Sequence, residues 1–225
     1  KQSVAESSFD AWTRYYRQDE NSPNALVSYY TKGSLVALGL DLTIRRESKG
    51  RRSLDDVMRL LWRRYGRDFY QGRPQGVAED ALPALVREAT GVDVADFIAR
   101  HAEGREDVPV QELLATQGIT THWKTAAQTP TLDVRTRNQG ADLTLATVFE
   151  GGAAHRAGLS AHDVLVAIDG LRVSAATGLE PLLARYRAGD AVRVHAFRRD
   201  ELREFTVRLA APQPLDCVFS TSAED

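Results

Sequence analysis

The spacing of apolar residues changes once along this chain, close to Gly118. Before that residue, apolar side chains return every three or four positions, which is typical of amphipathic helices. After it, short runs alternate between apolar and polar residues or are rich in β-branched residues, which predicts strands. We therefore expect an α+β fold, with an all-α helical subdomain at residues 1–118 and a small β-rich domain with two short helices at residues 119–211. Residues 212–225 carry neither pattern and are expected to form a loose C-terminal tail.

Capping and stop signals divide the first part into six expected helices. They cover residues 3–17, 25–46, 54–65, 77–89, 93–101 and 110–116. In the first of them, Phe9, Trp12 and Tyr16 share one stripe, as in an amphipathic helix. Asn24 can cap the second, which has few polar residues and is therefore expected to be buried on more than one side.

The second part has the pattern of a small sheet. Five strands are expected, at residues 131–137, 143–148, 164–168, 191–198 and 203–209. Two short helices, at residues 153–157 and 179–186, fall between them. Asp169-Gly170 is a strong signal for a tight turn after the third strand.

Composition excludes several classes of protein. Apolar residues make up 43% and charged residues 27%, an average balance for a soluble globular chain. The net charge of −2 gives no overall attraction to nucleic acid, and acidic residues interrupt the basic stretch from Arg45 to Arg67. No apolar run approaches the roughly 18 residues of a membrane span. Cys217 is the only cysteine, so neither an intrachain disulfide nor a thiolate-rich metal site can form.

The most specific motif lies in the second part of the chain. It reads Val148-Phe149-Glu150-Gly151-Gly152-Ala153-Ala154-His155-Arg156-Ala157-Gly158-Leu159, followed by Asp163-Val164-Leu165-Val166-Ala167-Ile168-Asp169-Gly170. Small residues let a short helix lie close to a sheet, and Gly158 can take the positive φ that turns the chain. The motif resembles the core of a PDZ domain of the kind appended to bacterial proteases, over roughly residues 119–209.

A PDZ domain captures an extended peptide between one sheet edge and a helix, and loop N–H groups hold the peptide's carboxylate. The resemblance therefore implies a peptide or protein C-terminus as partner. The candidate groove residues are Leu132, Asp133, Val134, Leu179, Leu182 and Leu183. The usual Gly-Leu-Gly-Phe loop is absent, and Asp133 stands where glycine is common, so a nearby acid is expected to oppose a bound carboxylate. The alternative is that the three leucines of the helix only fill the core.

The first part resembles the glycyl aminopeptidase family of zinc metallopeptidases. The similar residues are Asn24-Ala25-Leu26-Val27-Ser28-Tyr29-Tyr30-Thr31-Lys32-Gly33-Ser34-Leu35-Val36-Ala37, then Leu40-Asp41-Leu42-Thr43-Ile44-Arg45 and Ser53-Leu54-Asp55-Asp56-Val57-Met58-Arg59. In that family this segment follows the zinc site, lies in the helical part of a thermolysin-like domain and precedes a PDZ domain. The resemblance implies the same order here.

The resemblance also assigns a role to Tyr30. The family shares a Tyr-x-Lys-Gly segment, matched here by Tyr30-Thr31-Lys32-Gly33, whose tyrosine hydroxyl points at the scissile carbonyl. A neutral phenol can donate a hydrogen bond where negative charge develops on a tetrahedral intermediate. Two alternatives stay open, namely that Tyr30 is a buried aromatic of an apolar helix, and that the neighbouring Tyr29, which faces a different direction, has the role instead.

No metal site is expected within this chain. A zincin needs His-Glu-x-x-His so that two imidazoles on one helical face reach one metal. The five histidines are His101, His122, His155, His162 and His195, and no two have that spacing. His101 lies near Glu103, Glu106 and Asp107, a cluster that we interpret as solvated surface. The resemblance implies that zinc binds before Lys1 in the full-length protein.

The sequence is therefore interpreted as the C-terminal portion of a bacterial zinc aminopeptidase, inactive alone, whose full-length form acts on a peptide substrate. The competing interpretation is a PDZ adaptor, a peptide- or protein-binding module without catalysis at any length. A His-Glu-x-x-His motif encoded upstream of Lys1 would favour the enzyme. The resemblance leaves both the bacterial cytoplasm and the periplasm open as locations.

Overall fold

The computed structural model describes residues 2–72, 74–125 and 128–221, which form two compact units. The described residues of 1–16, 27–121 and 219–225 make up what we call the helical unit, and those of 17–26 and 122–218 make up the sheet unit. The segment 17–26 therefore groups with the second unit, although it lies in the first part of the sequence. The fold is of the α+β class, as expected.

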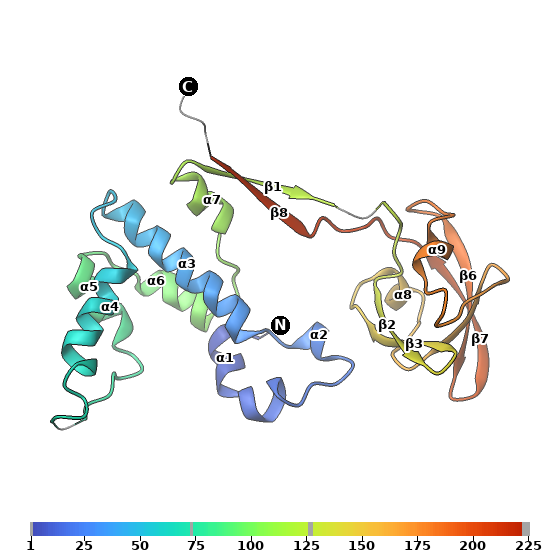
Figure 1. The fold of residues 1–225 in the computed structure, drawn as a ribbon, viewed down its shortest axis with the longest axis horizontal. Helices are drawn as coiled ribbons and strands as arrows, with labels where there is room; N and C mark the ends of the chain where they lie inside the picture. Colours follow the sequence, from blue (N-terminus) through green and yellow to red (C-terminus); the bar gives the residue numbers. More distant parts are fainter. Residues whose placement is uncertain (1, 73, 126–127, 222–225) are drawn as a thin grey trace. The chain divides into compact units, whose positions relative to one another are not determined.

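The helical unit consists of short helices arranged around one long helix, α3 (Figure 1). Its α-helices are α1 (Val4–Phe9), α3 (Tyr29–Glu47), α4 (Leu54–Leu61), α5 (Leu82–Thr90), α6 (Ala95–Ile98) and α7 (Val110–Ala115). Three π-helical turns extend α1, α4 and α6, at Ala11–Tyr15, Trp62–Gly66 and Ala99–Glu103. Contacts from α1, α4 and α7 converge on α3, which is therefore the centre of the unit.

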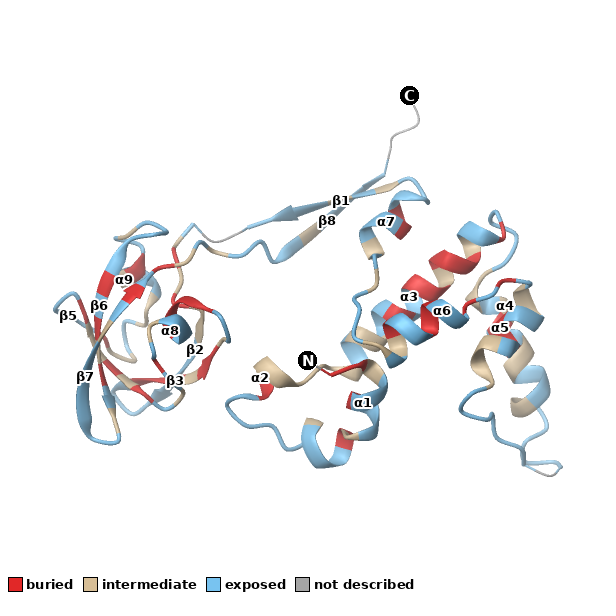
Figure 2. Cartoon of the chain, turned by 180° about the vertical axis from the view of Figure 1, so that it is seen from behind, coloured by how far each residue is buried: buried red, intermediate tan, exposed pale blue. Residues whose placement is uncertain are grey.

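α3 buries side chains on more than one face (Figure 2). Val36, Leu40 and Ile44 pack with α4 and α5, while Leu42 packs with Leu113 and its neighbours on α7. A Cβ on Gly39 would lie 2.3 Å from Val108 Cγ1, so the helix has room for no larger residue at that position.

α3 begins later than the sequence predicts. Leu26 is extended, and the Ser28 hydroxyl accepts the Thr31 N–H at 3.1 Å, so Ser28 is the N-cap and the helix starts at Tyr29. Asn24, the expected cap, instead lies in a separate turn, α2 (Ser22–Ala25), within the sheet unit. Its amide donates to Val148 O and accepts from Glu150 N–H, both at 2.9 Å. The prediction for Asn24 is therefore wrong because its side chain bonds the backbone at the end of β3 (Asp142–Val148) and just after it.

The first helix also differs from its expected form. α1 ends at Phe9, and the aromatic stripe Phe9, Trp12 and Tyr16 lies exposed. The buried positions are Ser3, Ser7 and Ala11, which lie on the opposite side of the segment. These small residues allow close approach to the chain that leads into α3, where the Ser7 hydroxyl donates to the Val27 carbonyl at 2.5 Å.

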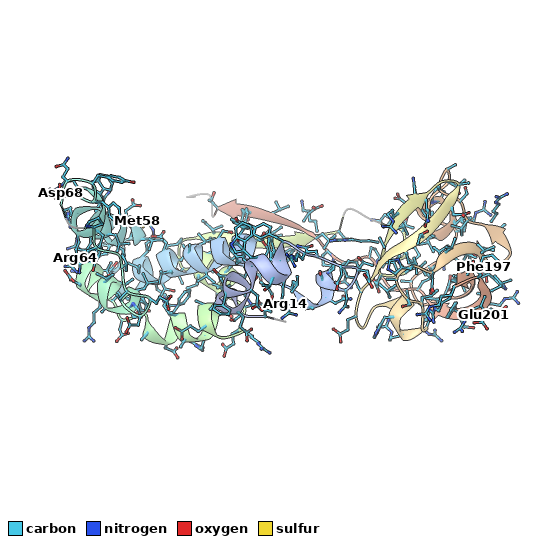
Figure 3. The ribbon with its side chains drawn as sticks, turned by 90° about the horizontal axis from the view of Figure 1, so that it is seen from below. Arg14, Met58, Arg64, Asp68, Phe197 and Glu201 are labelled. Atoms are coloured by element: carbon cyan, nitrogen blue, oxygen red, sulfur yellow. The ribbon has the colours of Figure 1, made fainter. Side chains whose placement is uncertain are left out.

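The sheet unit is an antiparallel sheet with short helices against it. Its elements after α2 are β2 (Val134–Gln139), β3, α8 (Ala153–Arg156), β4 (Val164–Ile168), β5 (Leu171–Arg172), α9 (Glu180–Leu183), β6 (Ala191–Arg198) and β7 (Glu201–Arg208). The strand order is β2-β3-β4-β6-β7, and β5 pairs with β4. β2 and β7 are thus the two edges of the strand order. Phe197 and Glu201 lie where the β6–β7 hairpin turns (Figure 3).

The core of the sheet unit is aliphatic, and one ion pair lies at its margin. Leu145, Ile168 and Val194 are fully buried at its centre. Asp163 is buried beside them, and its carboxylate accepts two hydrogen bonds from Arg198, at 2.8 and 2.7 Å, and one from the Ser160 N–H. This pairing satisfies a carboxylate that would otherwise be costly to bury.

The end of the chain is more ordered than expected. Residues Asp216–Thr221 form strand β8, which pairs with β1 (Ile119–Lys124) in a two-stranded ribbon, so the prediction of a loose tail is wrong for this stretch. Val218 is β-branched and Phe219 is aromatic, and both types are enriched in strands, but the pairing partner lies far away in sequence. Within the described ranges, no helix has the length and hydrophobicity to cross a membrane.

Candidate functional site

A groove of about 560 Å³ runs beside β2 and α9 in the sheet unit. Its walls are Thr129, Pro130, Thr131, Leu132, Val134 and Thr136 on the β2 side, and Thr177, Gly178, Leu179, Glu180, Pro181 and Leu183 on the α9 side. Four of the residues expected at a peptide groove are among these, namely Leu132, Val134, Leu179 and Leu183. Sequence analysis missed Thr136 and Glu180, although Thr136 follows Val134 at the two-residue spacing that puts side chains on one face of a strand.

The apolar wall of the groove is continuous with the core. Leu132 is 1% exposed and Leu183 is 5% exposed, and both belong to the central cluster of the sheet unit, while Val134 and Leu179 are half-buried against it. These side chains therefore both fill the core and line the groove. Leu182 packs partly buried against the same core but does not line the groove.

The edge of β2 is open to an added strand. The Phe149 N–H donates to the Asp133 carbonyl at 3.1 Å, so the next pair, Val134 with Val148, falls between hydrogen-bonded pairs. The backbone N–H and C=O of Val134 therefore point away from β3, toward the open edge. The Leu132 N–H, just before the strand, donates to no group in the described part of the chain.

Asp133 does not line the groove. It adopts a φ of 58°, a left-handed conformation that Asp tolerates better than most residues and that explains why glycine is common there. Its Oδ2 accepts the Ala153 N–H at 2.9 Å, at the start of α8. The carboxylate is therefore directed toward α8, and we revise the expectation that it opposes a ligand's carboxylate in the groove.

A second cluster lies in the helical unit and consists of tyrosines. The Tyr16 hydroxyl lies 2.9 Å from both the Tyr29 and the Tyr30 hydroxyls. The rings of Tyr29 and Tyr30 are 4.3 Å apart between centroids, and the Tyr15 hydroxyl donates to Ser28 Oγ at 3.1 Å. Tyr30 is 60% exposed, so the interpretation of this residue as a buried aromatic is wrong.

The hydrogen bonds of this cluster shift the pKa values of Tyr29 and Tyr30 in opposite directions. The hydrogen bond with Tyr16, followed by one with Tyr29, lowers the pKa of Tyr30 below its usual range. The pKa of Tyr29 is raised, chiefly by its hydrogen bonds with Tyr16 and then Tyr30. Tyr30 is therefore the hydroxyl of this adjacent pair that ionises first, and its O–H is the more acidic hydrogen-bond donor.

Tyr29 and Tyr30 also lie closer together than the sequence predicts. Adjacent helical positions diverge by about 100°, which led us to expect different directions. Both residues stand in the first turn of α3, and both phenol groups reach the hydroxyl of Tyr16, at the C-terminal end of the π-helical turn. The contribution of Tyr15 and Tyr16 was not foreseen, because a regular helix over residues 3–17 would place Tyr16 with Phe9 and Trp12.

A zinc ion finds no ligand set in the described part of the chain, where no three His, Cys, Asp or Glu side chains gather. His101, which we expected at a solvated surface, is 4% exposed, with its ring centroid 4.8 Å from that of Phe97 and Nδ1 3.3 Å from the Glu106 carbonyl oxygen. The contacts with the Phe97 ring and the Glu106 carbonyl account for the difference. The side chains in the described part of the chain therefore do not fit a metal ion.

Comparison with protein families matches both units. Residues 1–36 match the M61 glycyl aminopeptidase family, and residues 130–209 match the PDZ domain. The chain combines M61 glycyl aminopeptidase-like sequence with a PDZ domain. The groove beside β2 and α9 thus belongs to the PDZ domain, and Tyr16, Tyr29 and Tyr30 all fall within the M61 match. No curated protein matches the chain.

One solved structure matches nearly the whole chain, and others match less than half of it. An aminopeptidase N family protein from Idiomarina loihiensis is 34% identical, with a TM-score of 0.84, over 99% of this chain and 39% of that one. The chain thus spans about two fifths of the length of that relative. The PDZ domain of HtrA3 bound to a phage-derived ligand is 13% identical, with a TM-score of 0.32, over 44% of this chain and 91% of that one. A serine endoprotease from Yersinia pestis is 15% identical, with a TM-score of 0.30, over 36% of this chain and 30% of that one.

Proposed function

We propose that the PDZ domain of this peptidase-related chain binds the C-terminus of a peptide or protein as an extra strand along β2. The observation that carries the proposal is the open edge at Val134 beside an apolar groove. An added strand would bond its backbone to the Val134 N–H and C=O. Its terminal side chain would lie against Leu132 and Leu183, two buried residues of the groove wall.

The terminal carboxylate would be held by backbone amides at the start of β2. The N–H groups of Leu132 and Val134 are available for this, whereas the Asp133 N–H already donates to Thr131 Oγ1 at 2.9 Å. A carboxylate accepting backbone N–H bonds makes charge-assisted hydrogen bonds, which are stronger than neutral ones. Because the Asp133 carboxylate is bound at α8, it does not occupy this position.

The helical unit supports a second part of the proposal, that the chain belongs to a zinc-dependent aminopeptidase whose metal ligands lie outside the described residues. In that enzyme Tyr30 would donate a hydrogen bond to the oxygen that becomes negative as a peptide bond is attacked. The exposed hydroxyl of Tyr30 and its lowered pKa suit this task, because a more acidic donor stabilises developing charge better. Tyr16 would hold the ring in place.

Calorimetric titration tests peptide capture. A pentapeptide with a free carboxylate and an apolar last residue should bind the chain, and the same peptide as a C-terminal amide should bind at least about tenfold more weakly, because a charged hydrogen-bonded group contributes roughly 1.5–3 kcal/mol. Leu179→Glu in the groove should abolish binding. Leu202→Glu, at an exposed position on β7, is the matched control and should leave it unchanged. Equal binding of acid and amide would contradict the proposal.

A further inference from the structure

The groove of the PDZ domain is lined by apolar side chains, by threonines and by one carboxylate, that of Glu180. Among the described residues, Glu180 is the only charged side chain that lines the groove. It stands in the first turn of α9 and is exposed. Carboxylates such as those of Asp163 and Glu201 pair with an arginine, but Glu180 has no ion-pair partner among the described residues. An unpaired negative charge is therefore presented to any ligand in the groove.

The position of Glu180 relates it to a particular residue of the ligand. In an added strand, side chains two residues apart point the same way and lie about 6.6–6.8 Å from each other along the strand. Glu180 precedes Leu183 by three residues, which is about 4.5 Å along the α9 axis. With the terminal side chain against Leu132 and Leu183, the side chain two positions before the terminus points into the same groove, where Glu180 is the charged residue of the α9 wall.

The β2 side of the groove also favours a positively charged side chain on the ligand. Thr136 follows Val134 at the two-residue spacing and lines the groove, so it offers a hydroxyl and no positive charge at this level. The arginines of β2, Arg135 and Arg137, alternate with these residues and are not part of the groove wall. A cation placed between β2 and α9 would meet the Glu180 carboxylate without a competing positive group in the wall.

We propose that Glu180 makes the PDZ domain selective for C-termini with an apolar last residue and a lysine or arginine two residues before it. The proposal rests on the proposed peptide capture and adds the chemistry of the captured sequence. A long cationic side chain can lay its methylene groups against Leu179 and place its charge at Glu180. The opposite charge at that ligand position, a glutamate or aspartate, would be repelled by Glu180.

Three peptides that differ at one position test the selectivity. The peptides Ala-Ser-Xaa-Ala-Val, with Xaa as Lys, Ala or Glu and a free carboxylate, are titrated into the intact chain at low and at high salt. We expect the Lys peptide to bind about threefold tighter than the Ala peptide and about tenfold tighter than the Glu peptide, as suits a partly exposed ion pair. The differences should shrink at high salt.

Variants assign the preference to Glu180. In Glu180→Gln the three affinities should become equal, and in Glu180→Lys their order should reverse. Glu201→Gln, at the β6–β7 hairpin (Figure 3), removes the same charge elsewhere in the unit and should keep the wild-type order. If the wild type binds all three peptides equally, or if Glu180→Gln keeps the preference, the selectivity is overturned while peptide capture stands. If none of the three binds, capture itself is overturned along with it.

Discussion

The hydroxyl oxygens of Tyr16 and Tyr30 lie 2.9 Å apart, although the two residues stand on different elements of the helical unit. Tyr16 also lies at hydrogen-bond distance from Tyr29, so one phenol connects to both tyrosines of the first turn of α3. This arrangement fixes the ring of an exposed tyrosine that would otherwise be free to rotate. It also lowers the pKa of Tyr30.

The first prediction concerns the ionisation of this cluster. In Tyr16→Phe the main hydrogen bond that lowers the pKa of Tyr30 is lost, so that pKa should rise toward its ordinary value of 10.0. The phenolate absorbance of the variant should therefore appear at higher pH than in the wild type. Tyr70→Phe, the same exchange at an exposed tyrosine outside the cluster, is the matched control and leaves the hydrogen bonds of the cluster in place. If phenolate absorbance appears at the same pH in Tyr16→Phe and in the wild type, the hydrogen bond from Tyr16 does not lower the pKa of Tyr30.

The second prediction concerns catalysis by the full-length protein. Tyr30→Phe removes the proposed donor to the developing oxyanion, and loss of one such donor costs roughly 10²–10³ in kcat. We expect a loss of this size with KM little changed, because the donor acts on the transition state. Tyr70→Phe should keep full activity. Should Tyr30→Phe keep wild-type kcat while Tyr29→Phe loses it, the role would belong to Tyr29.

The third prediction concerns the close packing at the start of α8. A Cβ on Gly152 would lie 2.5 Å from Asp133 Cβ and 2.9 Å from the Phe149 carbonyl oxygen, so Gly152→Ala must displace the loop that precedes β2. We expect a loss of about 1–3 kcal/mol in the free energy of unfolding of the sheet unit, measured by denaturant titration. Gly76→Ala, where no atom lies within 4 Å of the added Cβ, is the control for the same exchange and should change little. If Gly152→Ala has the same free energy of unfolding as the wild type, the loop has more room than its packing indicates.

The fourth prediction concerns acid stability. The Glu6 carboxylate accepts hydrogen bonds from the Ser3 N–H, at 2.8 Å, and from the Arg105 guanidinium. Both bonds lower its pKa below the ordinary 4.5, and the bond from Ser3 has the larger effect. A lowered folded-state pKa means that the stabilisation is complete above pH 4.5 and is lost as the pH falls through the lower folded value. Melting temperatures of wild type and Glu6→Gln should therefore differ at neutral pH and converge in acid. A difference that grows in acid would have the wrong sign.

The sequence predicts the parts of this fold that depend on local pattern. The run from Val148 to Gly170 is enough to indicate the PDZ domain, because its glycines and small residues have positions that the turn and the packed helix require. The same resemblance to a PDZ domain allowed Leu132 and Val134 to be placed in the groove. Glu180 could not be placed there, because the apolar spacing of this segment points to Leu179 and Leu183 and does not show which polar residue lies beside them in the groove.

The features that sequence analysis missed depend on residues far apart in the chain. Tyr16 meets Tyr30 because Leu26 is extended and the chain turns back before α3, which helical periodicity does not show. β8 becomes a strand because β1 offers it an edge, and the ribbon is a pairing that neither segment reveals alone. Asn24 is a plausible cap by its type, but the backbone at the end of β3 and just after it binds its side chain instead.

The most direct test of the account is to locate a bound peptide C-terminus on the PDZ domain. Amide resonances of the isotope-labelled chain are followed by NMR as the free-carboxylate pentapeptide is added. We expect the largest shifts at Leu132 to Thr136 and at Leu179 to Leu183, the two sides of the groove. Shifts concentrated on the β6–β7 hairpin or on the helical unit, with β2 and α9 unmoved, would contradict it.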